Sequence, residues 1–323
     1  MHVLWNSLIR PAIDAVQPRI IVEIGTEDGK TTKQILESCA KWNAVLHTID
    51  PRPLLDPGEW KKKWGEYFVF HKQKSLEALS DIPFPDVILI DGDHNWYTVF
   101  HELKLIERRS KDEKKSFPLL FLHDVGWPYA RRDLYYDIEA IPPAYRRPHA
   151  VGGVIRGKQE LSPHGLNAKH VHATEEGTPQ NGVRTAVEDF LKQTDLGLEW
   201  MIMPGFHGLG IMAATETLER TPALQSFVQS LSSPEAQTAH MEFLEALRTE
   251  TLPNEQVLTE YAMSLKEHLA AQEKWAQGKQ TELEQALSAS QKREDRLYHS
   301  KSWRWTAPFR RVGLALRSFR QRS

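Results

Sequence analysis

Two carboxylates and an imidazole fall within four consecutive residues of this sequence, at Asp91, Asp93 and His94. They directly follow four aliphatic residues, 87–90, and such a run is typical of a strand that is buried on both faces of a sheet. Burying a carboxylate is costly unless a partner compensates for the lost water. The cluster therefore indicates a turn, a metal site or a reaction.

Other acidic residues share this position at the end of an apolar run. Asp50 ends the run 44–50, and Asp124, preceded by His123, ends the run 118–124. In an open α/β sheet, ligands bind outside the carboxyl ends of the strands, near the point where the strand order reverses. These acids are therefore expected at the ligand-binding edge of one sheet.

The elements that would position these residues alternate between strand and helix. Further apolar runs lie at 19–25, 67–70 and 86–91, and segments of helical periodicity separate them. This alternation predicts a parallel α/β sheet with helices on both faces. Residues 198–213 hold two more apolar runs joined by a Pro-Gly turn, which predicts an antiparallel hairpin. Residues 126–180 break the rhythm, and a long irregular segment of this kind is usually a functional loop, so we expect a lid or substrate-binding insertion there.

The turn after the first strand reads "EIGTEDGKTT". Gly25 and Gly29 would let the backbone approach a ligand, but their spacing matches neither the dinucleotide fingerprint nor a P-loop. Glu27 and Asp28 would repel a pyrophosphate. The turn favours a ligand with an amine, a sulfonium and a neutral ribose, whose hydroxyls Asp50 is placed to bind.

Six segments, in their order along the chain, resemble the class I S-adenosylmethionine-dependent methyltransferases: "VEIGTEDGKTT", "HTID", "KSLEAL", "VILIDGDHNWYTVFHELKL", "LLFLHD" and "NGVRTAVEDFL". More narrowly, the chain resembles the bacterial O-methyltransferases grouped with macrocin O-methyltransferase and the cephalosporin-hydroxylase-like proteins. The resemblance covers roughly residues 15–215. It implies an α/β, Rossmann-like fold with a seven-stranded, mostly parallel sheet whose last strand is antiparallel.

The resemblance also implies S-adenosylmethionine as cofactor. Its methionine part would lie at the first turn, its ribose at the end of the second strand and its adenine near the residues that follow the third. The cofactor-binding residues expected on this basis are Glu23, Gly25, Thr26, Gly29, Asp50, Lys74, Ser75 and Asp91.

A divalent metal at the ends of the fourth and fifth strands is a further implication of the resemblance. The matching residues are Asp91 and Asp124, with His123 where relatives often carry another acid. A His ligand moves the preference from Mg²⁺ toward Mn²⁺ or another transition metal. Relatives place the base two or three residues after the first metal ligand, which selects Asp93 or His94.

Methyl transfer to an alcohol needs help with one proton. The reaction is an in-line displacement, for which the enzyme must align the acceptor and remove its proton. An alcohol loses that proton only far above neutral pH, and a metal that binds two neighbouring hydroxyls lowers the barrier. Together with the resemblance, this predicts an O-methyltransferase acting on a sugar hydroxyl of a glycan or glycosylated metabolite.

Each proposed site residue also has a structural interpretation. Asp91 could cap a turn or the helix that follows, with Gly92 allowing the bend, and Asp93 could cap that helix. His94 could hydrogen-bond the cofactor or the substrate without acting as a base. His123 could support a metal ligand or pack behind the site. Three histidines in the insertion could bind a metal, contact substrate or simply lie on the surface. Four arginines there could bind a phosphate or an acidic sugar, or could remain solvated. These are His164, His170, His172, Arg131, Arg132, Arg146 and Arg147.

The C-terminal third differs in character from the rest. We expect a methyltransferase domain at 1–215, a helical linker at 216–254, a long helix or weak coiled coil at 255–300 and a basic aromatic tail at 301–323. The tail holds seven Lys or Arg and no acid. With its tryptophans, it suits an anionic membrane surface, and docking to a partner protein is the rival interpretation. Its "SWRWTAPFR" segment resembles tails of bacterial glycosyltransferases and cell-surface polysaccharide proteins, and the resemblance implies glycan assembly near the inner membrane.

The bulk composition narrows the remaining classes. The net charge of −2 gives no nucleic-acid footprint, and the single cysteine, Cys39, excludes an internal disulfide. No apolar run is long enough to span a bilayer, so a cytoplasmic protein is the default, with peripheral contact at the inner face of the bacterial inner membrane through the tail. The sequence leaves open whether the protein forms a homo-oligomer. The alternatives to a sugar methyltransferase are a hydroxylase-like enzyme on the same scaffold and a non-catalytic scaffold in polysaccharide assembly.

Overall fold

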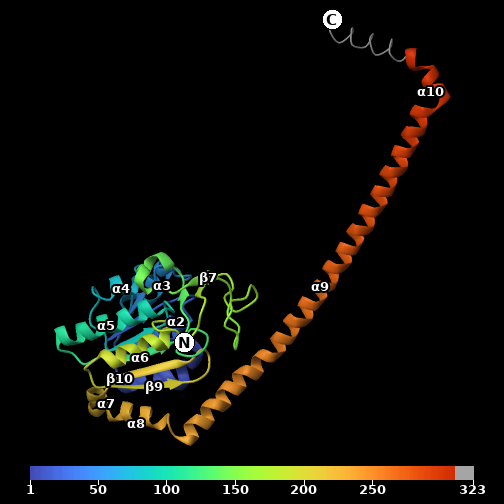
Figure 1. Ribbon diagram of the computed structural model, residues 1–323. Coiled ribbons are helices and arrows are strands. Elements are labelled where there is room, and N and C mark those ends of the chain that lie inside the picture. Colours follow the sequence, from blue (N-terminus) through green and yellow to red (C-terminus); the bar gives the residue numbers. More distant parts are fainter. Residues whose placement is uncertain (310–323) are drawn as a thin grey trace. The chain divides into compact units, whose positions relative to one another are not determined.

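The computed structural model describes residues 1–309 and divides into two compact units, Met1–Leu244 and a second that begins at Glu245. The first unit is built on a seven-stranded sheet of order β3-β2-β1-β4-β5-β10-β9 (Figure 1). Its strands are β1 (Ile20–Ile24), β2 (Val45–Ile49), β3 (Phe68–His71), β4 (Val87–Ile90), β5 (Leu119–His123), β9 (Leu198–Met203) and β10 (Leu209–Ala214). Strands β1 to β5 are parallel, and β10 is antiparallel to both of its neighbours. The predicted Rossmann-like fold is confirmed.

Helices cover both faces of the sheet, and the central strands are buried accordingly. In β4, Val87 and Leu89 belong to one hydrophobic cluster, while Ile88 and Ile90 belong to the other. All four are at most 3% exposed, because side chains alternate between two covered faces. The helices of this unit are α1 (Arg10–Val16), α2 (Lys30–Trp42), α3 (Pro57–Trp64), α4 (Ser75–Ala78), α5 (Trp96–Glu113), α6 (Val183–Gln193), α7 (Thr215–Arg220) and α8 (Pro222–Ser230), with a 3-10 turn (His2–Leu4) and a π-helical turn (Trp5–Ile9) ahead of α1.

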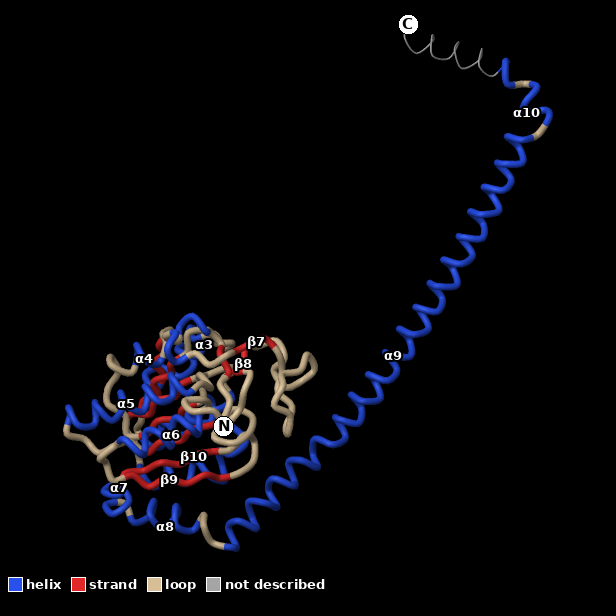
Figure 2. Tube along the Cα trace, viewed as in Figure 1, coloured by secondary structure: helices blue, strands red, loops and turns tan. Residues whose placement is uncertain are grey.

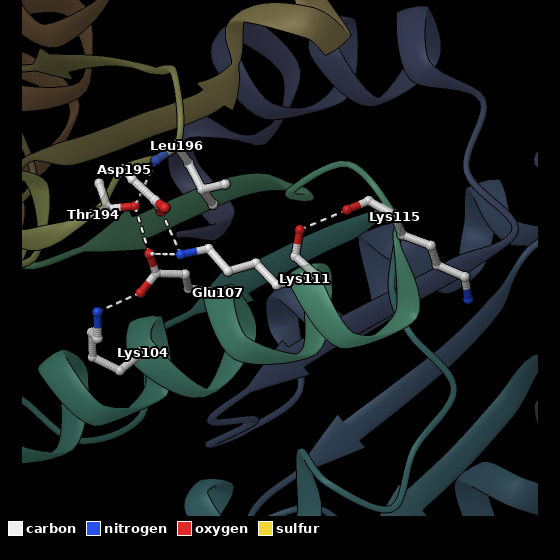
Figure 3. Close-up of polar contacts among 8 residues, drawn as sticks. Lys104, Glu107, Lys111, Lys115, Thr194, Asp195 and Leu196 are labelled. Carbon is white, nitrogen blue, oxygen red and sulfur yellow. Dashed lines mark hydrogen bonds and ion pairs between the residues drawn. The ribbon is translucent and has the colours of Figure 1, made fainter.

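A buried carboxylate ties α5 to the loop that leads into β9 (Figure 3). Glu107 is 3% exposed, and its oxygens accept hydrogen bonds from Lys104, Lys111 and Thr194. Burial acts to raise the pKa of Glu107, but these bonds outweigh it and hold the pKa below its ordinary value. A buried charge is stable only with such partners, so the network fixes the helix that begins two residues after His94.

The insertion at 126–180 is more ordered than its sequence suggested. It forms a second, antiparallel sheet of order β6-β8-β7, from β6 (Leu134–Tyr135), β7 (His149–Val151) and β8 (Val171–Ala173) (Figure 2). Short 3-10 helices lie between β6 and β7, at Ile138–Ala140 and Pro143–Tyr145. These strands have two or three residues each, too few to show a periodicity in the sequence.

One carboxylate fastens the insertion to the main sheet's helices. Asp133 is 1% exposed, and its Oδ1 accepts hydrogen bonds from Trp96 N at 2.7 Å and Gly182 N at 2.6 Å. Its Oδ2 accepts from the Tyr135 hydroxyl at 2.8 Å. Trp96 is the first residue of α5 and Gly182 precedes α6, so a single side chain satisfies the free N–H groups at the starts of two helices.

The C-terminal helices depart from the expected boundaries. Helices α7 and α8, in the expected linker, bury Leu218 and Leu224 in the core of the first unit, and Leu231, just after α8, is buried there too. Helix α9 (Pro234–His299) runs across residue 254 without a break, and α10 (Lys301–Trp305) follows. The tail expected at 301–323 lies partly outside the described residues, from 310 onward. Among residues 1–309, no helix combines the length and apolarity needed to cross a membrane.

Candidate active site

The turn after β1 is shaped by contact with the end of β4. Gly25 has φ +86°, and a Cβ there would lie 2.2 Å from the carbonyl oxygen of Asp91. Only glycine tolerates both conditions. The sequence suggested that Gly25 lets backbone approach a ligand, and the structure shows that it also lets two strand ends approach each other.

Asp50, expected to bind ribose, is hydrogen-bonded within the same turn. Its Oδ2 accepts from the backbone N and the hydroxyl of Thr26, both at 2.9 Å, and its Oδ1 accepts from Arg52 N at 2.7 Å. A carboxylate offers about four acceptor positions. Asp50 therefore holds the turn in shape through Oδ2, while Oδ1 accepts one bond and keeps a position open for a ribose hydroxyl.

The other expected cofactor residues line the same edge of the sheet. Glu23 is buried, accepts a hydrogen bond from Thr32 Oγ1 at 2.7 Å, and has its pKa raised by burial to about 8. Gly29 precedes α2 with φ +80°, where a Cβ would meet the Trp60 ring at 2.8 Å. Ser75 begins α4 and is buried. Lys74, just before it, donates to Asp137 at 2.9 Å.

The ends of β4 and β5 bring together the three expected metal ligands. His123 Nδ1 lies 3.1 Å from Asp91 Oδ1 and 3.0 Å from Asp124 Oδ2. Ligand atoms of all three residues lie within 4.8 Å of one another, and residues 1–309 hold no second group of this kind. Asp124 Oδ1 is buried without a hydrogen-bond partner. An orphaned carboxylate oxygen beside another acid and an imidazole fits a divalent cation.

The charges in this cluster are mutually dependent. Although burial opposes it, the charges of Asp91 and Asp124 raise the pKa of His123 to about 10. Burial likewise opposes ionisation of Asp91, but His123 holds the pKa of Asp91 well below its usual range. The α-amino group of Met1 also lies 3.2 Å from Asp91 Oδ2. The charges of His123 and the Met1 α-amino group thus balance the two carboxylates, and a divalent ion could take over this role.

His94 adjoins the cluster and is held between aromatic rings. Its Nδ1 lies 3.3 Å from Asp124 Oδ2. Its ring is stacked on Tyr129, with centroids 5.3 Å apart and an interplanar angle of 7°, and Tyr136 contacts it edge-on. With Nδ1 directed at a carboxylate, Nε2 is the nitrogen available to a substrate.

Neither Asp91 nor Asp93 caps α5, so the helix-capping interpretation of these two residues is wrong. The N-cap of α5 is Asn95, whose side chain accepts from Thr98 N at 2.8 Å. Asp93 accepts from the Thr98 hydroxyl at 3.1 Å, and burial raises its pKa. Asp93 therefore supports the start of α5 without capping it.

Most of the charged residues singled out in the insertion are engaged within the protein. Arg131 makes two hydrogen bonds to Glu188, and buried Arg132 donates to the carbonyls of Ala173 and Gln159. Arg146 pairs with Glu139. Arg147 donates to backbone carbonyls of Pro179 and Ala144. These arginines hold the insertion in shape, so the structure gives no support to an anion grip.

The three histidines of the insertion do not come together as a metal group. His172 is fully buried and stacks on Tyr129. His170 contacts the edge of Tyr136, whereas His164 is exposed. Tyr129 and Tyr136, which link two of these histidines to His94, were missed in the sequence because contacts between rings so far apart along the chain leave no local pattern.

His207 is a further site residue that sequence reasoning missed. It lies in the turn between β9 and β10, and its ring contacts the His123 ring edge-on, with centroids 6.2 Å apart. The available signal was a histidine close to two glycines, "GFHG", in the turn of the predicted hairpin.

Comparison with known proteins found a family model and similar solved structures. Residues 22–125 match a family model described as a methyltransferase domain. The match runs from within β1 to the residue after Asp124. No curated protein matched the sequence. Similar solved structures include a Podospora anserina methyltransferase, PaMTH1, with bound S-adenosylhomocysteine (14% identity, TM-score 0.40, 64% of this chain and 77% of that one). Others are the Burkholderia thailandensis 1,6-didemethyltoxoflavin-N1-methyltransferase (15%, 0.34, 64% and 76%) and human N-acetylserotonin methyltransferase (14%, 0.35, 65% and 52%).

At these identities, the three structures supply no residue role for this chain. The family match and the strand order observed here nevertheless agree on the class of protein. The match places a methyltransferase domain at residues 22–125, within the first unit.

Proposed function

We propose that this enzyme is an O-methyltransferase of the macrocin-like group that methylates a sugar hydroxyl of a glycan or glycosylated metabolite, assisted by a divalent metal. The observation that carries the proposal is the Asp91–His123–Asp124 group with His94 beside it. It combines a cation site and a general base at the ligand-binding edge of the sheet.

The roles of the residues follow from this arrangement. When bound, S-adenosylmethionine supplies a methyl carbon activated by its sulfonium, and a divalent ion supplies Lewis-acid polarisation of the acceptor hydroxyl. Asp91, His123 and Asp124 would hold that ion. Asp124 also faces Nδ1 of His94, so His94 would take the acceptor's proton at Nε2 while the rings around it fix its orientation.

The C-terminal tail suggests where the enzyme works. From 301 to 323 the sequence carries seven cations and no acid, together with aromatic residues. Such a segment is attracted to anionic lipid. We propose that it holds a cytoplasmic enzyme at the inner face of a bacterial inner membrane, close to glycan precursors.

A panel assay tests the proposed reaction. Purified protein is incubated with S-adenosylmethionine, methyl glycosides of common hexoses, and catechol as a non-sugar vicinal diol, and release of S-adenosylhomocysteine is measured. We expect release with at least one glycoside, loss of activity with chelator and recovery with Mn²⁺ or Mg²⁺. Full activity with chelator would refute metal assistance, and transfer to catechol alone would refute a sugar acceptor.

A further inference from the structure

The turn between β9 and β10 has an unusual backbone. Gly205, Phe206, His207 and Gly208 all have positive φ, at +99°, +45°, +69° and +82°. Gly208 N donates to Gly205 O at 2.8 Å, which closes a turn with positive φ at both central residues. Such hairpin turns favour Asn-Gly at these positions. Histidine tolerates positive φ better than phenylalanine does, but both residues are more costly there than glycine or asparagine.

This turn is fixed beside the candidate metal ligands. Leu209, the first residue of β10, pairs with His123, the last residue of β5. Gly126 N donates to the carbonyl oxygen of His207 at 2.6 Å. A Cβ on Gly126 would lie 2.7 Å from that same oxygen, so glycine permits the close approach. The position of His207 is therefore set by the segment that begins two residues after Asp124.

The hydrogen bond of the His207 ring determines which nitrogen carries its proton. Nδ1 lies 3.0 Å from the carbonyl oxygen of Trp127. A carbonyl can only accept, so Nδ1 must carry the hydrogen. In the neutral ring this leaves Nε2 as a hydrogen-bond acceptor on an exposed side chain.

These observations point to a binding role for a residue to which no role was given above. We propose that His207 is an acceptor-binding residue, whose Nε2 accepts a hydrogen bond from a hydroxyl of the polyhydroxylated acceptor next to the one that is methylated. The inference rests on the proposed function, because it needs an acceptor placed over the Asp91–His123–Asp124 group. Backbone strain retained at the edge of that group is consistent with a functional rather than a stabilising turn.

Relief of the strain separates function from structure. His207→Gly and His207→Asn place residues that favour positive φ in the turn, so both variants should melt about 2 to 4 °C above the wild type. Their affinity for S-adenosylhomocysteine, measured by calorimetry, should be unchanged. Their kcat/KM for the best acceptor of the panel should fall by about tenfold, mainly through KM, because one hydrogen bond to the acceptor is lost.

Phe206→Asn is the matched control, since it relieves the neighbouring strained position and leaves the imidazole in place. It should also melt higher, with kcat/KM unchanged. Full acceptor kcat/KM in His207→Gly would overturn the proposal, as would an equal loss in Phe206→Asn, which would assign the effect to the shape of the turn. If catechol is methylated with the same His207 dependence while no glycoside is, the sugar acceptor fails and the role of His207 stands. If no acceptor of the panel is methylated, both the proposed function and the binding role of His207 are contradicted.

Discussion

At the scale of single residues, the site combines features that the sequence shows with features that it hides. Asp91 and Asp124 could be predicted, because each ends an apolar run and strand ends meet at one edge of the sheet. The cap of α5 could not: Asp91, Asp93 and Asn95 are all good capping residues, and only the backbone geometry selects Asn95. His207 was missed because a histidine in a hairpin turn carries no periodic signal.

The buried acid Glu102 leads to a prediction about pH and stability. It is fully buried in α5, and burial raises its pKa to about 8. The folded protein keeps the proton while the unfolded chain releases it above the ordinary pKa of a glutamate. The free energy of unfolding should therefore fall as pH rises from about 4.5 to 8, by at most about 1.4 kcal/mol per pH unit from this group.

The isosteric variant Glu102→Gln isolates this effect, because it cannot ionise. Urea unfolding at pH 6 and pH 8 should show a smaller loss of stability in the variant than in the wild type. The exposed Glu66→Gln serves as the control and should follow the wild type. Parallel pH profiles for Glu102→Gln and the wild type would refute the assignment.

At the scale of elements, the main sheet could be predicted and the insertion could not. The strands of the main sheet could be predicted from their apolar runs and from the alternation of strand and helix segments, because the central strands are buried on both faces. The strands of the insertion are shorter and pair over long separations: Leu134 pairs with His172. Nothing local in the sequence identifies such a pair.

Asp133 should control the stability of the insertion. Replacing Asp133 with Ala leaves Trp96 N, Gly182 N and the Tyr135 hydroxyl without their acceptor. Each lost partner costs about 1 to 3 kcal/mol when the group stays buried. We expect a lower melting temperature and faster proteolytic cleavage within 150–170.

The exposed Asp112→Ala is the control for this experiment and should behave as the wild type. If Asp133→Ala melts and is cleaved as the wild type is, the carboxylate does not anchor the insertion.

At the scale of the whole molecule, the two units should separate in function. The first unit, Met1–Leu244, holds both hydrophobic clusters and every candidate site residue. A chain truncated after about residue 250 should therefore fold and bind S-adenosylhomocysteine as the full chain does.

The same truncation should abolish sedimentation with anionic vesicles, since each cation near such a surface contributes about 1 kcal/mol. Binding of the full chain should weaken with salt. If the truncated protein still sediments, or the full chain never does, docking to a partner protein becomes the better account of the tail.

The most direct test of the central claim is the single-turnover rate of methyl transfer in His94→Ala, measured with labelled S-adenosylmethionine and the best acceptor of the panel. His101→Ala, on the following helix, is the matched control. We predict that His94→Ala binds S-adenosylhomocysteine and Mn²⁺ as the wild type does but transfers methyl at least about 100-fold more slowly, because the general base is lost. His101→Ala should retain the wild-type rate. Transfer by His94→Ala at the wild-type rate would contradict the account.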